Sequence, residues 1–220
     1  MIDLDPAFAI IGLVVALGGP PLIARWGRST DTVSAHLAAQ AMLVGLAAIV
    51  VLIVVANCNA LSDLGIRGLG VSTLLWAAAT AVFFIFVAGP LLMRLPAVLG
   101  RPGFERGLSS LNRLPAWYLV LAVIVGGIVE ELLYRGFAVQ VLGTLIGNTW
   151  LAAAFVVIAF GLAHLPLWGL VPALTTMVSG AILTVLFLVH HDLIANMLAH
   201  IATDMAGIVF PRLRGRRRRA

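Results

Sequence analysis

Six ionisable side chains in the second half of the sequence have the types and spacing that acid–base chemistry needs. They are Glu130, Glu131, Arg135, His164, His200 and Asp204. Each lies within or at the end of an apolar run, where a charged side chain costs roughly 2.5–3.5 kcal/mol on membrane-insertion scales. Ionisable residues in such places usually serve a function, so this set is the candidate site.

The first motif is the pair Glu130–Glu131 followed by Arg135, at the end of an apolar run that predicts a helix. Glu131 and Arg135 are four residues apart and can pair along one helix face. Glu130 lies about 100° further round the helix and points elsewhere. The spacing therefore predicts a buried Glu131–Arg135 brace and an unpaired Glu130 that can act as a general base. A patch of Glu and Arg at a membrane interface is the alternative.

The other two motifs are Phe160-x-x-x-His164 and His200-x-x-x-Asp204. His200 and Asp204 are one helical turn apart, so the carboxylate can orient the imidazole. A lone histidine such as His164 can also be a hydrogen-bonded structural residue. If the three motifs converge, they supply a base, two imidazoles and a supporting carboxylate. That set can activate a water molecule and stabilise an oxyanion.

The composition indicates which elements must position these groups. The chain has 220 residues, of which 62% are hydrophobic and 10% charged, whereas soluble domains have about 25% charged residues. This excludes an ordinary water-soluble protein. At roughly 20 apolar residues per crossing, we expect an all-α polytopic membrane helix bundle with about 7–8 transmembrane helices. The candidate spans are 7–24, 35–56, 71–93, 115–134, 150–165, 170–190 and 193–210.

Charge and spacing divide the chain into three expected parts. Residues 1–114 hold the N-terminal transmembrane helices and a basic loop, residues 115–210 a catalytic core, and residues 211–220 a basic tail. A basic tail beside a membrane span favours anionic membrane lipid as its partner over nucleic acid. P-loop, dinucleotide-binding and zinc-finger patterns are missing from the sequence, which closes off several enzyme classes.

In order and spacing, the three motifs resemble those of the CPBP intramembrane proteases, the Abi/CAAX-protease family related to the prenyl endopeptidase Rce1. The resemblance covers about residues 115–210, and the run Gly180-Ala181-Ile182-Leu183 also fits it. It implies an intramembrane endopeptidase, of the CAAX or bacteriocin-processing kind, in a multi-pass protein of the cell membrane. Its partner would be a membrane-associated protein or peptide substrate.

The resemblance also implies a role for each motif residue. Glu130 and His164 would activate water, and His200 with Asp204 would form the pair on the oxyanion or metal side. Glu131 and Arg135 would support them, together with Phe160 of the second motif.

Two departures from the family pattern affect these roles. The family commonly has Asn where this chain has Asp204, and an ionised carboxylate cannot donate a hydrogen bond to an oxyanion. The family often has a Thr-Gly-Ser-Leu-Trp-like turn where this chain has the run His190-His191-Asp192-Leu193-Ile194. We interpret His190 and His191 as interfacial residues.

Three alternatives stay open at this point. A divalent metal such as zinc could be held by Glu130, His164, His200 and Asp204, although the zincin His-Glu-x-x-His pattern is missing and direct Glu/His catalysis ranks slightly higher. The chain could instead be a non-catalytic family member that acts in bacteriocin immunity or as a membrane scaffold. It could also be a proton-coupled transporter.

The sequence also gives a topology, with a conflict. If Glu130 and His164 both end their spans and meet at one depth, segment 136–149 must cross back between them. That predicts eight helices, with both termini on one side of the membrane. The basic tail and the basic loop 94–114 would then lie on opposite sides, against the tendency of arginines to stay in the cytoplasm.

Overall fold

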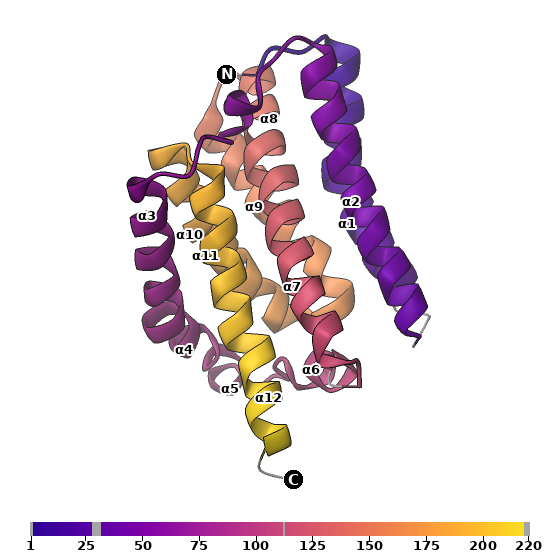
Figure 1. Cartoon of the computed structure of the whole chain (residues 1–220), viewed down its shortest axis with the longest axis vertical. Helices are drawn as coiled ribbons and strands as arrows, with labels where there is room; N and C mark the ends of the chain where they lie inside the picture. Colours follow the sequence, from indigo (N-terminus) through magenta and orange to yellow (C-terminus); the bar gives the residue numbers. More distant parts are fainter. Residues whose placement is uncertain (1, 28–31, 112, 218–220) are drawn as a thin grey trace.

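The structure is a computed structural model that describes residues 2–27, 32–111 and 113–217, and every regular element in these ranges is a helix. Seven helical segments in the described residues are long and apolar enough to cross a membrane (Figure 1). The predicted all-α bundle is thus confirmed, with seven spans. They are Pro6–Trp26, Val33–Ala56, Val71–Val98, Ala116–Ile146, Thr149–Trp168, Leu170–His190 and Leu193–Leu213.

Several spans combine α-helix with short 3-10 or π-helical pieces. In chain order the elements are α1 (Pro6–Gly27), α2 (Val33–Ala56), the 3-10 turn η1 (Leu61–Leu64), α3 (Val71–Phe83), the π-helix η2 (Phe84–Ala88), α4 (Gly89–Leu92), α5 (Leu95–Val98), α6 (Glu105–Leu111), α7 (Ala116–Glu130), the π-helix η3 (Glu131–Val139), α8 (Gln140–Ile146), α9 (Thr149–Trp168), α10 (Leu170–His190), α11 (Leu193–Asp204), the π-helix η4 (Met205–Val209) and α12 (Phe210–Arg217).

Tight turns join the helices that carry the candidate site. Gly147 ends α8 in the left-handed conformation, and the side chain of Asn148 caps α9 by accepting a hydrogen bond from the Leu151 amide at 3.0 Å. His191 ends α10 in the same left-handed region, and Asp192 caps α11 at the Ala195 amide, also at 3.0 Å. Such short connections make consecutive helices antiparallel neighbours.

The expected eighth helix is wrong, because the fourth span does not stop after the first motif. α7, η3 and α8 form one continuous span to Ile146. Glu130 therefore lies in the middle of its helix and not at its end. Glu130 and His164 are both 17 residues from the tight turn at Gly147, which is about five turns at 3.6 residues per turn. Antiparallel helices thus bring them to the same depth, and no extra crossing is needed.

Seven crossings place the two ends of the chain at opposite ends of the bundle, as Figure 1 shows for N and C. The segment between the third and fourth spans then lies at the same end as the last helix. This end, which we call the arginine-rich end, carries Arg25, Arg94, Arg101, Arg113 and Arg212. The other end, which we call the acidic end, carries Arg67 with Asp3, Asp5, Asp63 and Asp192. The conflict between basic loop and basic tail therefore disappears.

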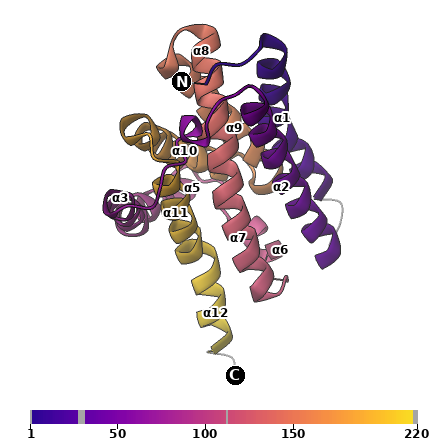
Figure 2. The same cartoon turned by 45° about the horizontal axis from the view of Figure 1, so that its top comes forward.

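The fourth span lies at the centre of the helix packing. In both views α1 and α2 lie on one side of α7 and α9, and α3 lies on the other side, next to α11 (Figures 1 and 2). All nine residues of η3 are buried, and its apolar members belong to the largest hydrophobic cluster. Glu131 and Arg135 of the first motif are thus enclosed by protein.

Candidate active site

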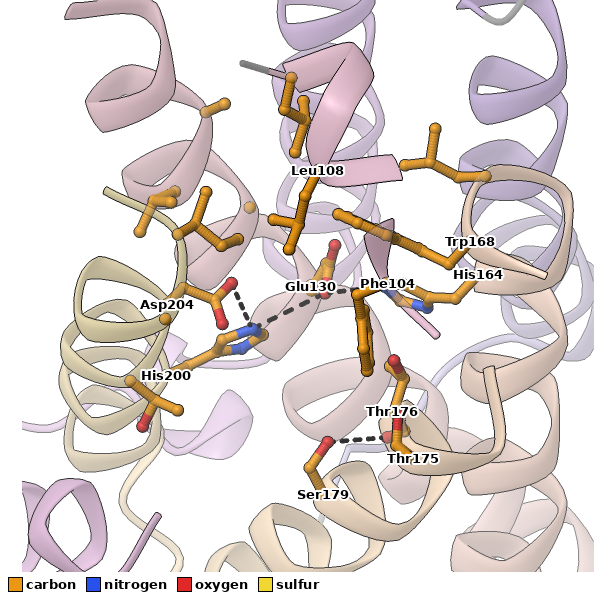
Figure 3. A pocket seen from close by; sticks show the side chains of 18 of the residues that line it. Phe104, Leu108, Glu130, His164, Trp168, Thr175, Thr176, Ser179, His200 and Asp204 are labelled. Carbon is orange, nitrogen blue, oxygen red and sulfur yellow. Dashed lines mark hydrogen bonds and ion pairs between the residues drawn. The ribbon is translucent and has the colours of Figure 1, made fainter. Parts of the chain in front are cut away.

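Four of the predicted site residues converge in the structure from three helices (Figure 3). The Glu130 Oε2 atom lies 3.9 Å from Nε2 of His164 and 4.0 Å from Nε2 of His200. The same His200 nitrogen lies 3.6 Å from Oδ2 of Asp204. α7, α9 and α11 contribute these side chains, so residues far apart in the sequence form one polar cluster inside the bundle.

The cluster borders a cavity of about 670 Å³. The walls come from those halves of the long helices that lie toward the arginine-rich end. Leu108 of α6 and Phe104, the residue just before α6, also line the cavity. The side chains of Asp204 and Glu130 are 38% and 23% exposed. Phe160 also lines the cavity and is buried, so the exposed fraction falls toward its inner end. The cavity therefore lies in the half of the bundle toward the arginine-rich end, and the carboxylates of Glu130 and Asp204 are accessible there.

Behind the cavity, Glu131 and Arg135 form the expected ion pair. The Arg135 Nη1 atom donates to Oε1 of Glu131 at 2.9 Å, and both side chains are essentially fully buried. The remaining guanidinium donors reach the Thr184 hydroxyl at 3.2 Å and the Gly180 carbonyl at 3.0 Å. Because a buried ion pair stabilises only when its remaining groups are also hydrogen-bonded, these two acceptors complete it.

Glu131 also holds two residues of α11. Its Oε1 atom accepts from Nδ1 of His200 at 2.9 Å, and its Oε2 atom accepts from the Asn196 side chain at 3.1 Å. The sequence predicted that Asp204 orients His200. The structure shows that Glu131 makes the short hydrogen bond to the imidazole, while Asp204 faces its other nitrogen. The Glu131–Arg135 ion pair therefore also positions His200, a residue of the site.

Hydrogen bonds fix which nitrogen of each histidine carries a proton. The His164 Nδ1 atom lies 2.8 Å from the Phe160 carbonyl oxygen. A carbonyl only accepts, so this nitrogen donates and the Nε2 atom is left facing Glu130. By the same reasoning His200 donates from Nδ1 to the Glu131 carboxylate. Both imidazoles thus turn their Nε2 atoms toward Glu130.

Phe160, predicted as a supporting residue, packs at the centre of the site. Its ring lies under the guanidinium of Arg135, with 4.4 Å between Cζ and the ring centroid, a cation–π geometry. It also makes edge contacts with Tyr134 and His164, at centroid distances of 4.9 and 4.7 Å. One aromatic ring therefore separates the buried ion pair from the cavity.

Sequence reasoning missed Asn196 and Thr184, and did not recognise the role of Gly180. Asn196 precedes His200 by one turn, so extending the His200-x-x-x-Asp204 spacing backwards would have found it. A Cβ atom on Gly180 would lie 2.7 Å from Cδ1 of Phe160 and 3.0 Å from Nη2 of Arg135, which explains the glycine. The π-helix η3 had no sequence signal. Such helices are rare and frequent at functional sites.

His190 and His191 do not join the cluster, because they lie at the acidic end of the bundle. The ring of His190 stacks on Trp76 with centroids 3.6 Å apart. Burial lowers the pKa of His191, and the positive charge of Arg67 lowers it further.

The polar cluster does not fit a metal ion as it stands. Within the part of the chain that the structure describes, no three His, Cys, Asp or Glu side chains are grouped closely enough to hold one. Two ligands of a tetrahedral zinc ion, each about 2.1 Å from it, lie roughly 3.4 Å apart. The separations of 3.9 and 4.0 Å around Glu130 are larger. The reaction is therefore derived below from the side chains alone.

Fold and site together define a multi-pass helical membrane protein with a carboxylate–histidine cluster among its membrane-spanning helices. Residues 112–206 match the sequence profile of the type II CAAX prenyl endopeptidase Rce1-like family. This segment, residues 112–206, is therefore similar to the Rce1-like family, the family that the three motifs resemble. No curated protein and no solved structure matches the chain.

Proposed function

We propose that this protein is an intramembrane endopeptidase that hydrolyses a peptide bond with a water molecule activated by Glu130. The observation that carries the proposal is the convergence of Glu130, His164 and His200 on one cavity wall. The similarity of residues 112–206 to the family of type II CAAX prenyl endopeptidases supports the reaction class. A transporter or a non-catalytic scaffold gains no support from the comparisons.

The spacing of the acceptors suits a bridging water. At 3.9 Å, the Glu130 and His164 atoms are too far apart for a direct hydrogen bond. Two hydrogen bonds of about 2.8 Å that meet at a water oxygen at nearly 90° span about 4.0 Å. A water held in this way donates one proton to each side chain. Its oxygen lone pairs then point into the cavity, toward a substrate carbonyl.

The reaction then follows the usual course of acid–base peptide hydrolysis. Glu130 takes a proton from the water as its oxygen bonds to the carbonyl carbon, and the carbonyl π electrons move to the oxygen. His164 keeps the attacking oxygen in place, and His200 with Asp204 lies on the oxyanion side. When the carbon–nitrogen bond breaks, the leaving nitrogen takes the proton back from Glu130. The electrons on the oxyanion return to form the carbonyl as this bond breaks, which gives a carboxylic acid and an amine. Transfer of the acid proton to the amine then leaves a carboxylate and an ammonium group.

The substrate class follows from the family and the cavity. We propose a membrane-associated peptide, of which the prenylated CAAX type is the first to test. The cavity lies within the membrane-spanning helices, and apolar side chains such as Phe104 and Leu108 line it beside the site. A lipid-modified chain end could therefore enter without leaving an apolar environment.

The test is cleavage of a fluorescence-quenched farnesylated CAAX peptide by the purified protein in proteoliposomes. Glu130→Ala, His164→Ala and His200→Ala should each abolish cleavage and still insert into membranes. A chelator should leave the rate unchanged. The same peptide without its farnesyl group tests the lipid requirement. Parent-like activity in Glu130→Ala would overturn the proposal, and loss of activity with chelator would overturn the metal-free step.

We further propose that the protein lies in the cell membrane with its arginine-rich end in the cytoplasm. Cytoplasmic segments of membrane proteins carry the excess of arginine and lysine. Here Arg94, Arg101, Arg113 and Arg212 share one end, and aspartates dominate the other. The cavity would then lie in the cytoplasmic half of the bundle.

The single cysteine offers a direct test of this orientation. Cys58 is free and exposed at the acidic end, just after α2. A membrane-impermeant maleimide should label it from outside intact cells. In a Cys58→Ser background, Arg101→Cys should react only after the membrane is opened. The reverse pattern would show that the bundle is inserted the other way.

A further inference from the structure

Glu130 shares its helix face with Tyr134, which lies one turn deeper toward the inner end of the cavity. Tyr134 is only 1% exposed, and its ring packs edge-on against Phe160. Its hydroxyl has no hydrogen-bond partner among the residues that the structure describes. An unpaired buried hydroxyl destabilises the folded state, and a phenylalanine ring would pack on Phe160 equally well, so the hydroxyl of this tyrosine points to a function.

The serine and threonine hydroxyls of the cavity wall all donate hydrogen bonds to backbone carbonyls. Thr175 and Thr176 donate to the Pro172 carbonyl, Ser179 to Thr176 and Thr203 to Ala199. Each of these bonds stays within one helix.

The hydroxyl of the other tyrosine, Tyr118, donates a hydrogen bond to the His36 carbonyl and accepts one from Gln40. Of the described hydroxyls that line the cavity, Tyr134 is therefore the one that keeps its proton available.

The charged residues around Glu130 do not replace this donor. Asp204, as a carboxylate, can only accept hydrogen bonds. The two ring nitrogens of His200 both face carboxylates, Nδ1 toward Glu131 at 2.9 Å and Nε2 toward Asp204 at 3.6 Å. The His164 Nδ1 proton is held by the Phe160 carbonyl. Because both ring nitrogens of His200 face carboxylates, a tetrahedral intermediate formed beside Glu130 needs a further hydrogen-bond donor on its oxyanion side.

We propose that Tyr134 is a further catalytic residue, whose hydroxyl donates a hydrogen bond to the oxyanion formed when water adds to the substrate carbonyl. This inference rests on the proposed peptidase function. The phenol keeps its proton throughout, so the step needs no other co-reactant. In the dry inner end of the cavity such a hydrogen bond is stronger than in water, and it strengthens as the negative charge develops.

Tyr134→Phe tests the proposal, because it removes the hydroxyl and keeps the ring on Phe160. With the farnesylated CAAX peptide in proteoliposomes, we expect kcat to fall roughly 100-fold, the usual effect of losing one oxyanion donor. KM should stay within about twofold, since the oxyanion is absent from the ground state. The unfolding midpoint should stay the same or rise, because an unpaired buried hydroxyl is lost.

Tyr118→Phe is the matched control, as it deletes the other tyrosine hydroxyl. Its hydroxyl is paired, so this variant should lower the unfolding midpoint and reduce kcat at least tenfold less than Tyr134→Phe does. Parent-like kcat in Tyr134→Phe would overturn the proposal. A fall in both kcat and unfolding midpoint would overturn it too, because that shows a structural hydroxyl. Glu130→Gln, measured alongside, separates the hypotheses: if it is inactive while Tyr134→Phe is parent-like, only the role of Tyr134 fails.

Discussion

Glu130 and Glu131 are neighbours in the sequence, yet they belong to two different regions of the molecule. Glu131 is fully buried in a network with Arg135, Asn196 and His200. Glu130 is 23% exposed on the cavity wall, with its nearest histidine nitrogens at 3.9 and 4.0 Å. Both carboxylate oxygens of Glu131 accept hydrogen bonds from protein side chains, whereas the carboxylate of Glu130 faces the space where a substrate would bind.

The difference shows how one helix can carry both a structural and a reactive acid. Successive residues point about 100° apart, so the rotation separates the two carboxylates onto different faces. All nine residues of the π-helix that begins at Glu131 are buried, and this helix packs against α1, α9 and α11. The hydrogen-bond network of Glu131 fixes His200, whereas the carboxylate of Glu130 remains free to transfer a proton. Three substitutions can break or sharpen this division.

Arg135→Met should have the largest effect on stability. It leaves the Glu131 carboxylate buried beside two weaker partners, and removing one member of a buried pair costs about 3–5 kcal/mol. The measurement is the unfolding midpoint in detergent, with Arg101→Met at the exposed arginine-rich end as control. Adding Glu131→Gln to Arg135→Met should recover part of the loss. An unchanged midpoint in Arg135→Met would contradict the structural role of this region.

Asn196→Ala should have an intermediate effect. Its amide donates to Glu131 at 3.1 Å and to the Leu183 carbonyl at 2.8 Å, and both acceptors stay buried. Leaving buried acceptors unpaired costs about 1–3 kcal/mol. Unfolding and kcat should be measured on the same sample. We expect both to fall, since Glu131 also positions His200, and a fall in kcat without loss of stability would place Asn196 in the reactive region instead.

His191 should have the smallest effect, because it lies outside both regions. Burial and Arg67 lower its pKa in the folded state. The unfolded chain therefore binds the proton at higher pH, so stability is full above about pH 6.5 and declines as the pH falls below it. His191→Asn, which tolerates the left-handed conformation, should weaken this decline between pH 7 and 5. An unchanged pH slope of the unfolding midpoint would rule out this contribution.

Much of the fold could be predicted because a bilayer imposes simple rules. Apolar runs of about 20 residues marked all seven spans, with errors mainly at their ends. The fourth span was cut short at 134, since the charged residues Glu130, Glu131 and Arg135 looked like a helix end. Their burial in the middle of a continuous helix depends on acceptors from α10 and α11, which local sequence does not show.

The candidate site was predictable to a similar degree. Spacing identified Glu130, His164, His200 and Asp204, and the structure brings these four together. Their catalytic roles, and the division of the chain into residues 1–114, 115–210 and 211–220, stay predictions. The orienting role of Glu131 toward His200 could not be predicted, because it depends on how two helices face each other. The unpaired hydroxyl of Tyr134 likewise becomes visible only once every neighbouring donor has a known partner.

The most direct test of the central claim compares Glu130→Gln with Glu131→Gln, two neighbouring changes of the same chemistry. Cleavage of the farnesylated CAAX peptide and the unfolding midpoint should be measured on both proteins in the same lipid. We predict that Glu130→Gln loses about 1,000-fold in kcat, the middle of the range for a positioned general base, and unfolds like the parent. Glu131→Gln should unfold at a clearly lower midpoint. Parent-like cleavage by Glu130→Gln would contradict the account.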